Sequence, residues 1–296
     1  MEPQIKERSK RIRHIAVPQA ETDVFATAEY ERNVTLWSLR DREKINELST
    51  VLDYGARRIA VVQESEHCRL IAASFEGPVN AYDPEGNVVW SRGDLTGVQQ
   101  VMPLVSNSRA LIGLGLEGQP YKILSAIDGR EISRLNGISK LYGSQSTLSF
   151  LGVTAKNVVC LESLDSRPLW EQPLKSFAIL HCGLSPRHAV YSEAAGCLYC
   201  FDLDGRQRWV IRPDRNRHFL RVSWNQATEK WMAIDWNFEN GGSKRLFEIG
   251  EIGNTRVVAN LGEMAETEFF ASGDLLIGSH GAVIDTQSGQ PVWNFI

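Results

Sequence analysis

The residues best suited to bind a partner form a run of arginines in the last third of the chain. Six arginines fall within residues 206–221, and Asp214 is the one acidic residue among them. They are Arg206, Arg208, Arg212, Arg215, Arg217 and Arg221, with Trp209 and Phe219 between them. Arginine beside aromatic residues suits contacts with phosphates and bases and the anchor positions of protein interfaces. The run predicts a partner-binding surface. Its other interpretation is a charged, solvated edge strand on which Trp209 packs inward.

A protein is the partner that this run favours. The whole chain has a formal net charge of -4, so its overall field does not attract nucleic acid. Nucleic acid bound by the arginines of 206–221 stays as an alternative. A second basic stretch, within residues 6–13, is interpreted as part of a solvated tail.

Aromatic residues just after this run are the second candidate for recognition. Trp224, Trp231 and Trp236 fall within thirteen residues, and Phe238 follows shortly before a glycine pair at 241–242. Exposed aromatic side chains in a loop mark recognition sites, so Trp236 and Phe238 are expected to contact the partner. The alternative is that Trp224 and Trp236 pack between the repeated units of the fold.

Residues that could do catalysis or hold a metal lack the necessary spacing. The six histidines form no H-E-x-x-H pair, and the sequence has no G-x-S-x-G or G-x-x-x-x-G-K motif. Cys197 and Cys200 have C-x-x-C spacing, with Cys182 upstream, but side chains three apart on a strand point to opposite faces. We expect these cysteines to be small buried hydrophobes. The sequence therefore predicts no catalytic residue, no cofactor and no metal.

The composition predicts a globular chain of the cytoplasm. Hydrophobic residues make up 43% and charged residues 23% of the 296 residues, both ordinary values. The first ten residues are charged where a secretion signal needs an apolar core, and no stretch approaches the ~20 apolar residues of a membrane span. The odd number of cysteines, five, indicates reduced thiols. We expect a cytoplasmic location and no membrane contact.

The elements that must position these residues are repeated hairpins. The clear copies are residues 82–90, 201–209 and 284–293, and a weaker copy spans 165–170. Each clear copy has an acidic, glycine-containing turn and a tryptophan four residues past the glycine. Turns of this kind fall near Asp41, Gly86, Gly129, Ser166, Gly205, Gly253 and Gly289. Their spacing matches the ~40–45 residues of a four-stranded propeller blade.

Seven units predict an all-β fold, a single β-propeller of seven four-stranded blades, with six or eight blades as the alternatives. Residues 1–11 are expected to form a charged tail and residues 12–296 the propeller. We expect each blade to consist of consecutive residues; in the alternative, residues near 12–17 add a strand to the last blade. Segments rich in small residues, such as 71–74 and 112–115, are expected on the innermost strands, where the blades converge.

The repeated phrase Asp-x-x-Gly-x-x-x-Trp resembles the repeat of PQQ-like β-propellers, in which the outer-strand tryptophan packs between adjacent blades. The first unit, residues 34–41, looks more like a WD40 repeat because Trp37 precedes its turn. The resemblance is at superfamily level. It implies a structural, inter-blade role for Trp37, Trp90, Trp170, Trp209 and Trp293, and it implies no activity.

The function predicted from these features is that of a non-catalytic protein–protein interaction scaffold or regulatory subunit of a larger cytoplasmic assembly, which binds a protein partner through a propeller face. One alternative is a small-ligand-binding protein or a lactonase-like hydrolase with its site in the central funnel. The second is a nucleic-acid-associated subunit that uses the arginines of 206–221.

Overall fold

The computed structural model describes most of the chain. The described residues are 12, 14–17, 23–28, 33–49, 58–64, 67–106, 109–143, 149–164, 168–175, 179–239, 242–263, 267–270 and 272–296. The predicted tail, residues 1–11, and the turn expected near Ser166 lie outside them. In this part of the chain the secondary structure is entirely strands and turns, and no helix could cross a membrane.

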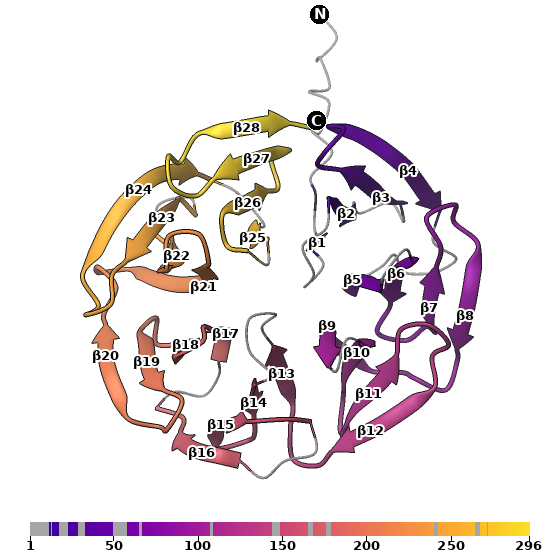
Figure 1. Cartoon of the computed structure of the whole chain (residues 1–296), viewed down its shortest axis with the longest axis horizontal. Helices are drawn as coiled ribbons and strands as arrows, with labels where there is room; N and C mark the ends of the chain where they lie inside the picture. The colour runs from indigo at the N-terminus through magenta and orange to yellow at the C-terminus, as the bar shows by residue number, and fades with distance from the viewer. Residues whose placement is uncertain are drawn as a thin grey trace, which may run out of the picture.

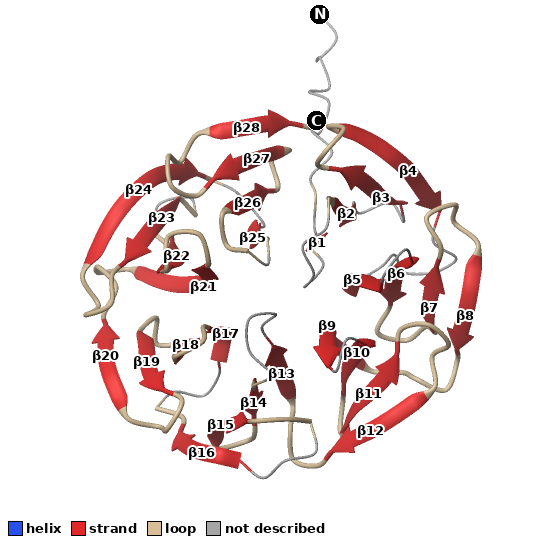
Figure 2. Cartoon of the chain, viewed as in Figure 1, coloured by secondary structure: helices blue, strands red, loops and turns tan. Residues whose placement is uncertain are grey.

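The strands form seven antiparallel sheets, each of four consecutive strands, arranged as a ring (Figures 1 and 2). Blade 1 contains β1 (His14–Ala16), β2 (Val24–Ala28), β3 (Asn33–Ser38) and β4 (Glu43–Ser49). Blade 2 contains β5 (Arg58–Glu64), β6 (His67–Ala73), β7 (Val79–Tyr82) and β8 (Val88–Arg92). Blade 3 contains β9 (Val98–Ser106), β10 (Arg109–Leu116), β11 (Tyr121–Ser125) and β12 (Glu131–Leu135).

Blade 4 contains β13 (Lys140–Gly143), β14 (Phe150–Val153), β15 (Asn157–Leu161) and β16 (Pro168–Pro173). Blade 5 contains β17 (Ile179–Leu184), β18 (His188–Glu193), β19 (Leu198–Asp202) and β20 (Gln207–Ile211). Blade 6 contains β21 (Arg217–Asn225), β22 (Lys230–Asn237), β23 (Lys244–Ile249) and β24 (Thr255–Gly262). Blade 7 contains β25 (Thr267–Phe269), β26 (Leu275–Gly278), β27 (Ala282–Asp285) and β28 (Pro291–Asn294). The prediction of seven four-stranded blades is confirmed.

Each blade runs outward from the axis, with its first strand innermost and its fourth on the perimeter (Figure 1). Because the strands alternate in direction, the disc has two different faces. We call one the connection face, since it carries the links from one blade to the next and the loops between second and third strands. The other, the turn face, carries the turns between first and second and between third and fourth strands. Every pairing of a third with a fourth strand shows a register shift, and such bulges blunt the exposed outer edges.

The segments rich in small residues lie on second strands, not on the innermost ones. Residues 112–115 belong to β10, and 71–73 belong to β6, so the expectation that they line the axis is wrong. The reason is local packing within the blade. A Cβ added to Gly113 would lie 2.6 Å from the Tyr121 hydroxyl on the neighbouring strand, so this glycine leaves room for the buried tyrosine ring.

Tryptophans on the outer strands contact the turn of the following blade. The Trp90 indole N–H donates to the carbonyl of Ala126 in blade 3 at 3.0 Å, and Trp209 donates to that of Glu251 in blade 6 at 3.1 Å. Trp170 of blade 4 packs on Gly205 of blade 5. Each of these side chains thus joins two blades at the turn face.

Blades 7 and 1 close the ring through aromatic packing. Trp37 and Phe25 of blade 1 meet Trp293 and Phe295 at the end of the chain, with ring centroids 4.9 Å apart for Trp37 and Phe295 and 5.2 Å for Phe25 and Phe295. β1 pairs with β2, and β25 to β28 form blade 7 alone. Consecutive blades are therefore confirmed, and the alternative of a strand exchanged into blade 7 is wrong.

Candidate functional site

Two arginines of the predicted run reach the connection face as exposed side chains. Arg212 and Arg215 lie between β20 and β21, where the chain passes from blade 5 to blade 6. Asp214, the one acidic residue of the run, is engaged by Arg245 of β23 at 2.7 Å. Arg245 thus compensates part of the charge of Asp214, and Arg212 and Arg215 are exposed cations of this loop.

An aromatic group stands beside these arginines. Phe238 follows β22 and is 45% exposed. Its ring packs edge-on against His218, with centroids 5.0 Å apart, and lies 6.2 Å from the Trp236 ring. The Phe238 N–H donates to the carbonyl of Asn216 at 3.2 Å, which fixes the aromatic group next to Arg215. We call Arg212, Arg215, His218, Trp236 and Phe238 the blade 6 rim.

The remaining arginines of the run lie elsewhere, because β20 and β21 carry the chain across the disc and toward its axis. Arg206 and Arg208 are exposed at the turn-face end of β20, roughly 15 Å from its other end at ~3.3 Å per residue. The Nε of Arg208 lies 3.4 Å from Oδ1 of Asp202 on the neighbouring strand. This placement corrects the expectation of a single surface made by all six arginines.

Arg217 is buried in an ionic network inside blade 6. Its Nε donates to Asp235 Oδ2 at 2.7 Å and its Nη2 donates to Oδ1 at 2.9 Å. Arg245 donates to the same carboxylate at 2.6 Å, and the Asp235 side chain is fully buried. Two guanidinium groups thus compensate one buried carboxylate, as burial of charge requires. Arg217 holds β21 to β22 and does not face a partner.

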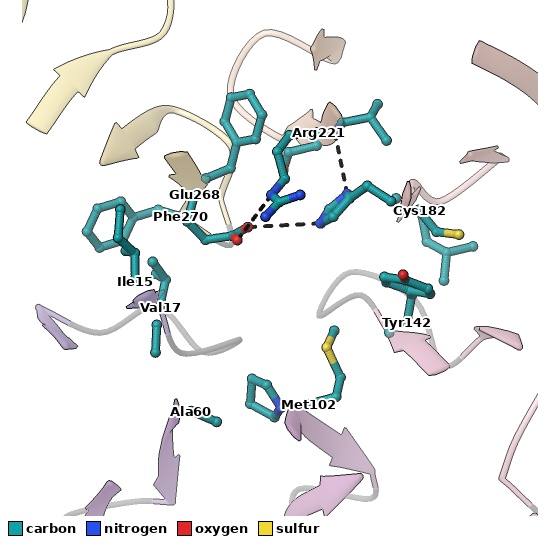
Figure 3. A pocket seen from close by; sticks show the side chains of 18 of the residues that line it. Ile15, Val17, Ala60, Met102, Tyr142, Cys182, Arg221, Glu268 and Phe270 are labelled. Atoms are coloured by element: carbon teal, nitrogen blue, oxygen red, sulfur yellow. Dashed lines mark hydrogen bonds and ion pairs between the residues drawn. The ribbon is translucent and has the colours of Figure 1, made fainter. Parts of the chain in front are cut away.

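Arg221 points into the central cavity, which has a volume of about 350 Å³. Figure 3 shows its guanidinium beside the carboxylate of Glu268, with Nε and Oε2 3.4 Å apart. His181 also lies near this carboxylate, with its Nε2 4.0 Å from Glu268 Oε1. Apolar side chains, among them Ile15, Val17 and Met102, line another part of the cavity (Figure 3). Arg221, Glu268 and His181 thus form a polar wall from blades 5 to 7, and Arg58 and Gln100 of blades 2 and 3 also line the cavity.

The polar side chains of this wall act between blades. His181 Nδ1 accepts the N–H of Val222 in blade 6 at 3.4 Å, so the ring proton resides on Nε2. Burial lowers the pKa of His181 to about 3, and the charge of Arg221 adds to this shift. His181 is therefore a neutral hydrogen-bond acceptor at physiological pH. Burial also raises the pKa of the Tyr142 hydroxyl and the Cys182 thiol, so both stay protonated.

Other inner-strand side chains repeat this arrangement. The Gln100 amide of blade 3 bonds both backbone groups of Leu141 in blade 4, at 3.0 and 3.2 Å. Arg58 of blade 2 donates to the carbonyl of Gln99 in blade 3 at 2.8 Å. Each innermost strand has one edge whose backbone N–H and C=O groups are not paired with another strand. These side chains form hydrogen bonds with some of those groups. We infer that the channel's polar residues first serve to join the blades.

These channel residues were not among those predicted from the sequence. The sequence spacing of these residues could have indicated them. The hydrogen-bonded pairs are residues 58 and 99, 100 and 141, and 181 and 222, and the members of each pair are 41 positions apart, about the length of one blade. The cysteines were assigned correctly in one respect, since Cys182 and Cys200 are buried. Within the described residues, no group of three potential metal ligands comes together.

Comparison with known proteins identifies the fold. No family model matches the sequence, and no curated protein is significantly similar to it. The structure is similar to the β-propeller domain of Cps50 (Swd1) from Myceliophteria thermophila, with a TM-score of 0.70 and 14% identity over 95% of each chain. It is also similar to the computationally designed Ika8 protein, with a TM-score of 0.65 and 12% identity over 96% of this chain and 86% of that one. The resemblance to PQQ-like repeats stays a prediction. The likeness shows a β-propeller fold alone.

Proposed function

We propose that this chain is a non-catalytic protein-interaction scaffold, a subunit of a larger cytoplasmic assembly, that binds its partner through the blade 6 rim. The observation that carries the proposal is the position of Phe238. A phenylalanine that is 45% exposed yet held by His218 and by a backbone hydrogen bond to Asn216 is an ordered apolar anchor. Ordered anchors lose little conformational entropy on binding, so they contribute strongly to affinity.

The surroundings of Phe238 favour a partner of particular chemistry. Arg212 and Arg215 are exposed on the same face, and Asp214 is occupied by Arg245. A protein segment with an apolar side chain next to carboxylates would complement both the aromatic group and the two guanidinium groups. The bidentate geometry of arginine suits carboxylates.

Binding by paired variants tests the proposal. Phe238→Ala and Arg215→Glu change the blade 6 rim, whereas Ile252→Ala and Arg206→Glu change exposed residues of the turn face. Partners captured with the wild-type chain from native lysate are identified by mass spectrometry, and the purified partner is then titrated against each variant. We expect the rim variants to lose at least tenfold in affinity and the turn-face variants to retain it.

Loss of binding in the turn-face variants with retention in the rim variants would contradict the proposal. The salt dependence of the same titration addresses nucleic acid. A captured nucleic acid whose affinity falls steeply with salt, and which survives Phe238→Ala, would support the alternative that the arginines bind phosphate.

A further inference from the structure

A second cavity lies on the turn face, between blades 5 and 6. Its volume is about 350 Å³, at the small end of the range for ligand sites. Three tryptophans line it: Trp209 of β20, Trp224 of β21 and Trp231 of β22. Charged and polar side chains complete the lining, among them Arg187, Gln226, Glu229 and Glu251. We propose that this cavity binds a neutral sugar ring.

The aromatic walls are fixed in place. Trp224 and Trp231 meet edge to face, with centroids 5.3 Å apart and planes at 65°. A Cβ added to Gly183 would lie 2.9 Å from the Trp231 ring, so the absence of a side chain at this position lets the indole reach the boundary between blades. Trp209 is held by its hydrogen bond to Glu251. Indole faces carry negative partial charge, and the polarised C–H groups on one face of a sugar ring can stack against them.

An unused hydrogen-bond donor faces this space. Trp231 is only 2% exposed, but its indole N–H has no acceptor in the described part of the chain, and its nitrogen is not among the fully buried unpartnered atoms. The N–H therefore opens on the cavity that this residue lines. Trp224, whose indole N–H also has no acceptor among the described residues, lines both this cavity and the central one. A ligand that fills the cavity should offer an acceptor to the Trp231 N–H.

The charged residues supply acceptors and a further donor. The carboxylates of Glu229 and Glu251 accept hydrogen bonds, Arg187 donates, and Gln226 can do both. Hydroxyl groups of a sugar donate and accept, so they match this mixed set. A quaternary ammonium ion also favours aromatic walls, but it would meet Arg187 and the indole donor of Trp231, to which it offers no acceptor. The mixed lining thus selects a neutral polyhydroxylated ring.

Glu229 closes the turn between β21 and β22 with a left-handed backbone. Its φ is 52°, and it is one of three non-glycine residues with positive φ in the described chain. This conformation is unfavourable for a residue with a Cβ. Glycine would fit the same turn, so Glu229→Gly should fold at least as well as the wild type while it removes one acceptor.

Methyl glycosides of glucose, galactose, mannose and N-acetylglucosamine are the probes, each titrated into ¹⁵N-labelled protein. The indole N–H signals report the site directly. We expect at least one glycoside to bind saturably and to shift the signals of Trp224 and Trp231 but not that of Trp236 on the opposite face. Glu229→Gly and Glu251→Gln should each raise its Kd at least tenfold, and Glu239→Gln on the connection face should leave it unchanged.

Three results would overturn the proposal. The first is that none of the glycosides binds saturably. The second is that a glycoside binds with the same Kd to the wild type and to both cavity variants. The third is that tetramethylammonium binds at this site and none of the glycosides does. Because the cavity and the blade 6 rim lie on opposite faces, none of these outcomes depends on the protein partner. Partner titration in the presence of the bound glycoside distinguishes the two sites.

Discussion

The indole of Trp90 occupies the space that a side chain on Gly129 would need. A Cβ at Gly129 would lie 2.8 Å from the Trp90 ring, and Gly129 has a φ of 68°. The two residues belong to neighbouring blades, and the same relation joins Trp170 to Gly205 and Trp209 to Gly253. The glycine of each of these three turns thus serves two purposes: it allows the left-handed backbone of its own turn, and it leaves room for the tryptophan of the preceding blade.

A double-mutant cycle measures this contact. We expect Trp90→Ala to destabilise the fold by about 3–5 kcal/mol through lost burial. Gly129→Ala should also destabilise it, because the new Cβ meets the ring and the backbone is left-handed. The double variant should cost less than the sum, since the clash disappears with the indole. Urea unfolding of the four proteins gives the coupling energy, and strict additivity would show that the two residues do not interact.

Acid sensitivity should depend on His181. Its pKa is lowered to about 3 in the folded protein from 6.5, so the unfolded chain binds the proton more readily. The stability that the neutral ring contributes is therefore complete above pH 6.5 and is lost as the pH falls toward 3. Between pH 6.5 and 5 the loss amounts to at most about 2 kcal/mol at ~1.4 kcal/mol per pKa unit.

His181→Gln provides the comparison, because Gln100 bonds the next blade with an amide at the corresponding place in blade 3. We expect this variant to unfold with a weaker pH dependence between pH 6.5 and 5 than the wild type. Equal slopes in the two proteins would mean that His181 does not titrate as its burial requires.

The buried carboxylate of Asp235 should be essential to blade 6. Asp235→Ala leaves Arg217 and Arg245 without their shared partner, and an uncompensated buried charge costs about 3–5 kcal/mol. Replacing Arg217 as well, in Asp235→Leu with Arg217→Met, should restore much of the lost stability, with Arg245 left to Asp214. Thermal unfolding compares the variants, and a single Asp235→Ala substitution that is neutral would contradict this role.

The seam between blades 7 and 1 should open first when its aromatic packing is weakened. Phe295 contacts Phe25, Trp37 and Trp293, and none of the described strands is exchanged across this boundary. We expect Phe295→Ala to speed hydrogen exchange in β2, β3, β26 and β27 more than in β10 and β11. Exchange that rises equally in all blades would indicate global destabilisation instead of a local seam.

The repeated phrase predicted the blades because each copy contains both its turn and its packing residue, as in Gly86 and Trp90. The partners of these residues could not be predicted, since they lie one blade away in sequence. Arg217 shows the same limit of prediction from sequence. Its charge suggested an exposed surface, but Asp235 on the adjacent strand draws it into the interior. Phe238 was predicted as a candidate because a glycine pair follows it, and its exposure agrees with a loop position.

The blade 6 rim is tested most directly by site-specific photo-crosslinking. The crosslinking amino acid p-benzoylphenylalanine is placed at position 238, and in a matched protein at position 252, where Ile252 is 83% exposed on the turn face. After irradiation with the captured partner, we predict a covalent complex from position 238 and none from position 252. A complex formed from position 252 alone would contradict the proposed binding surface.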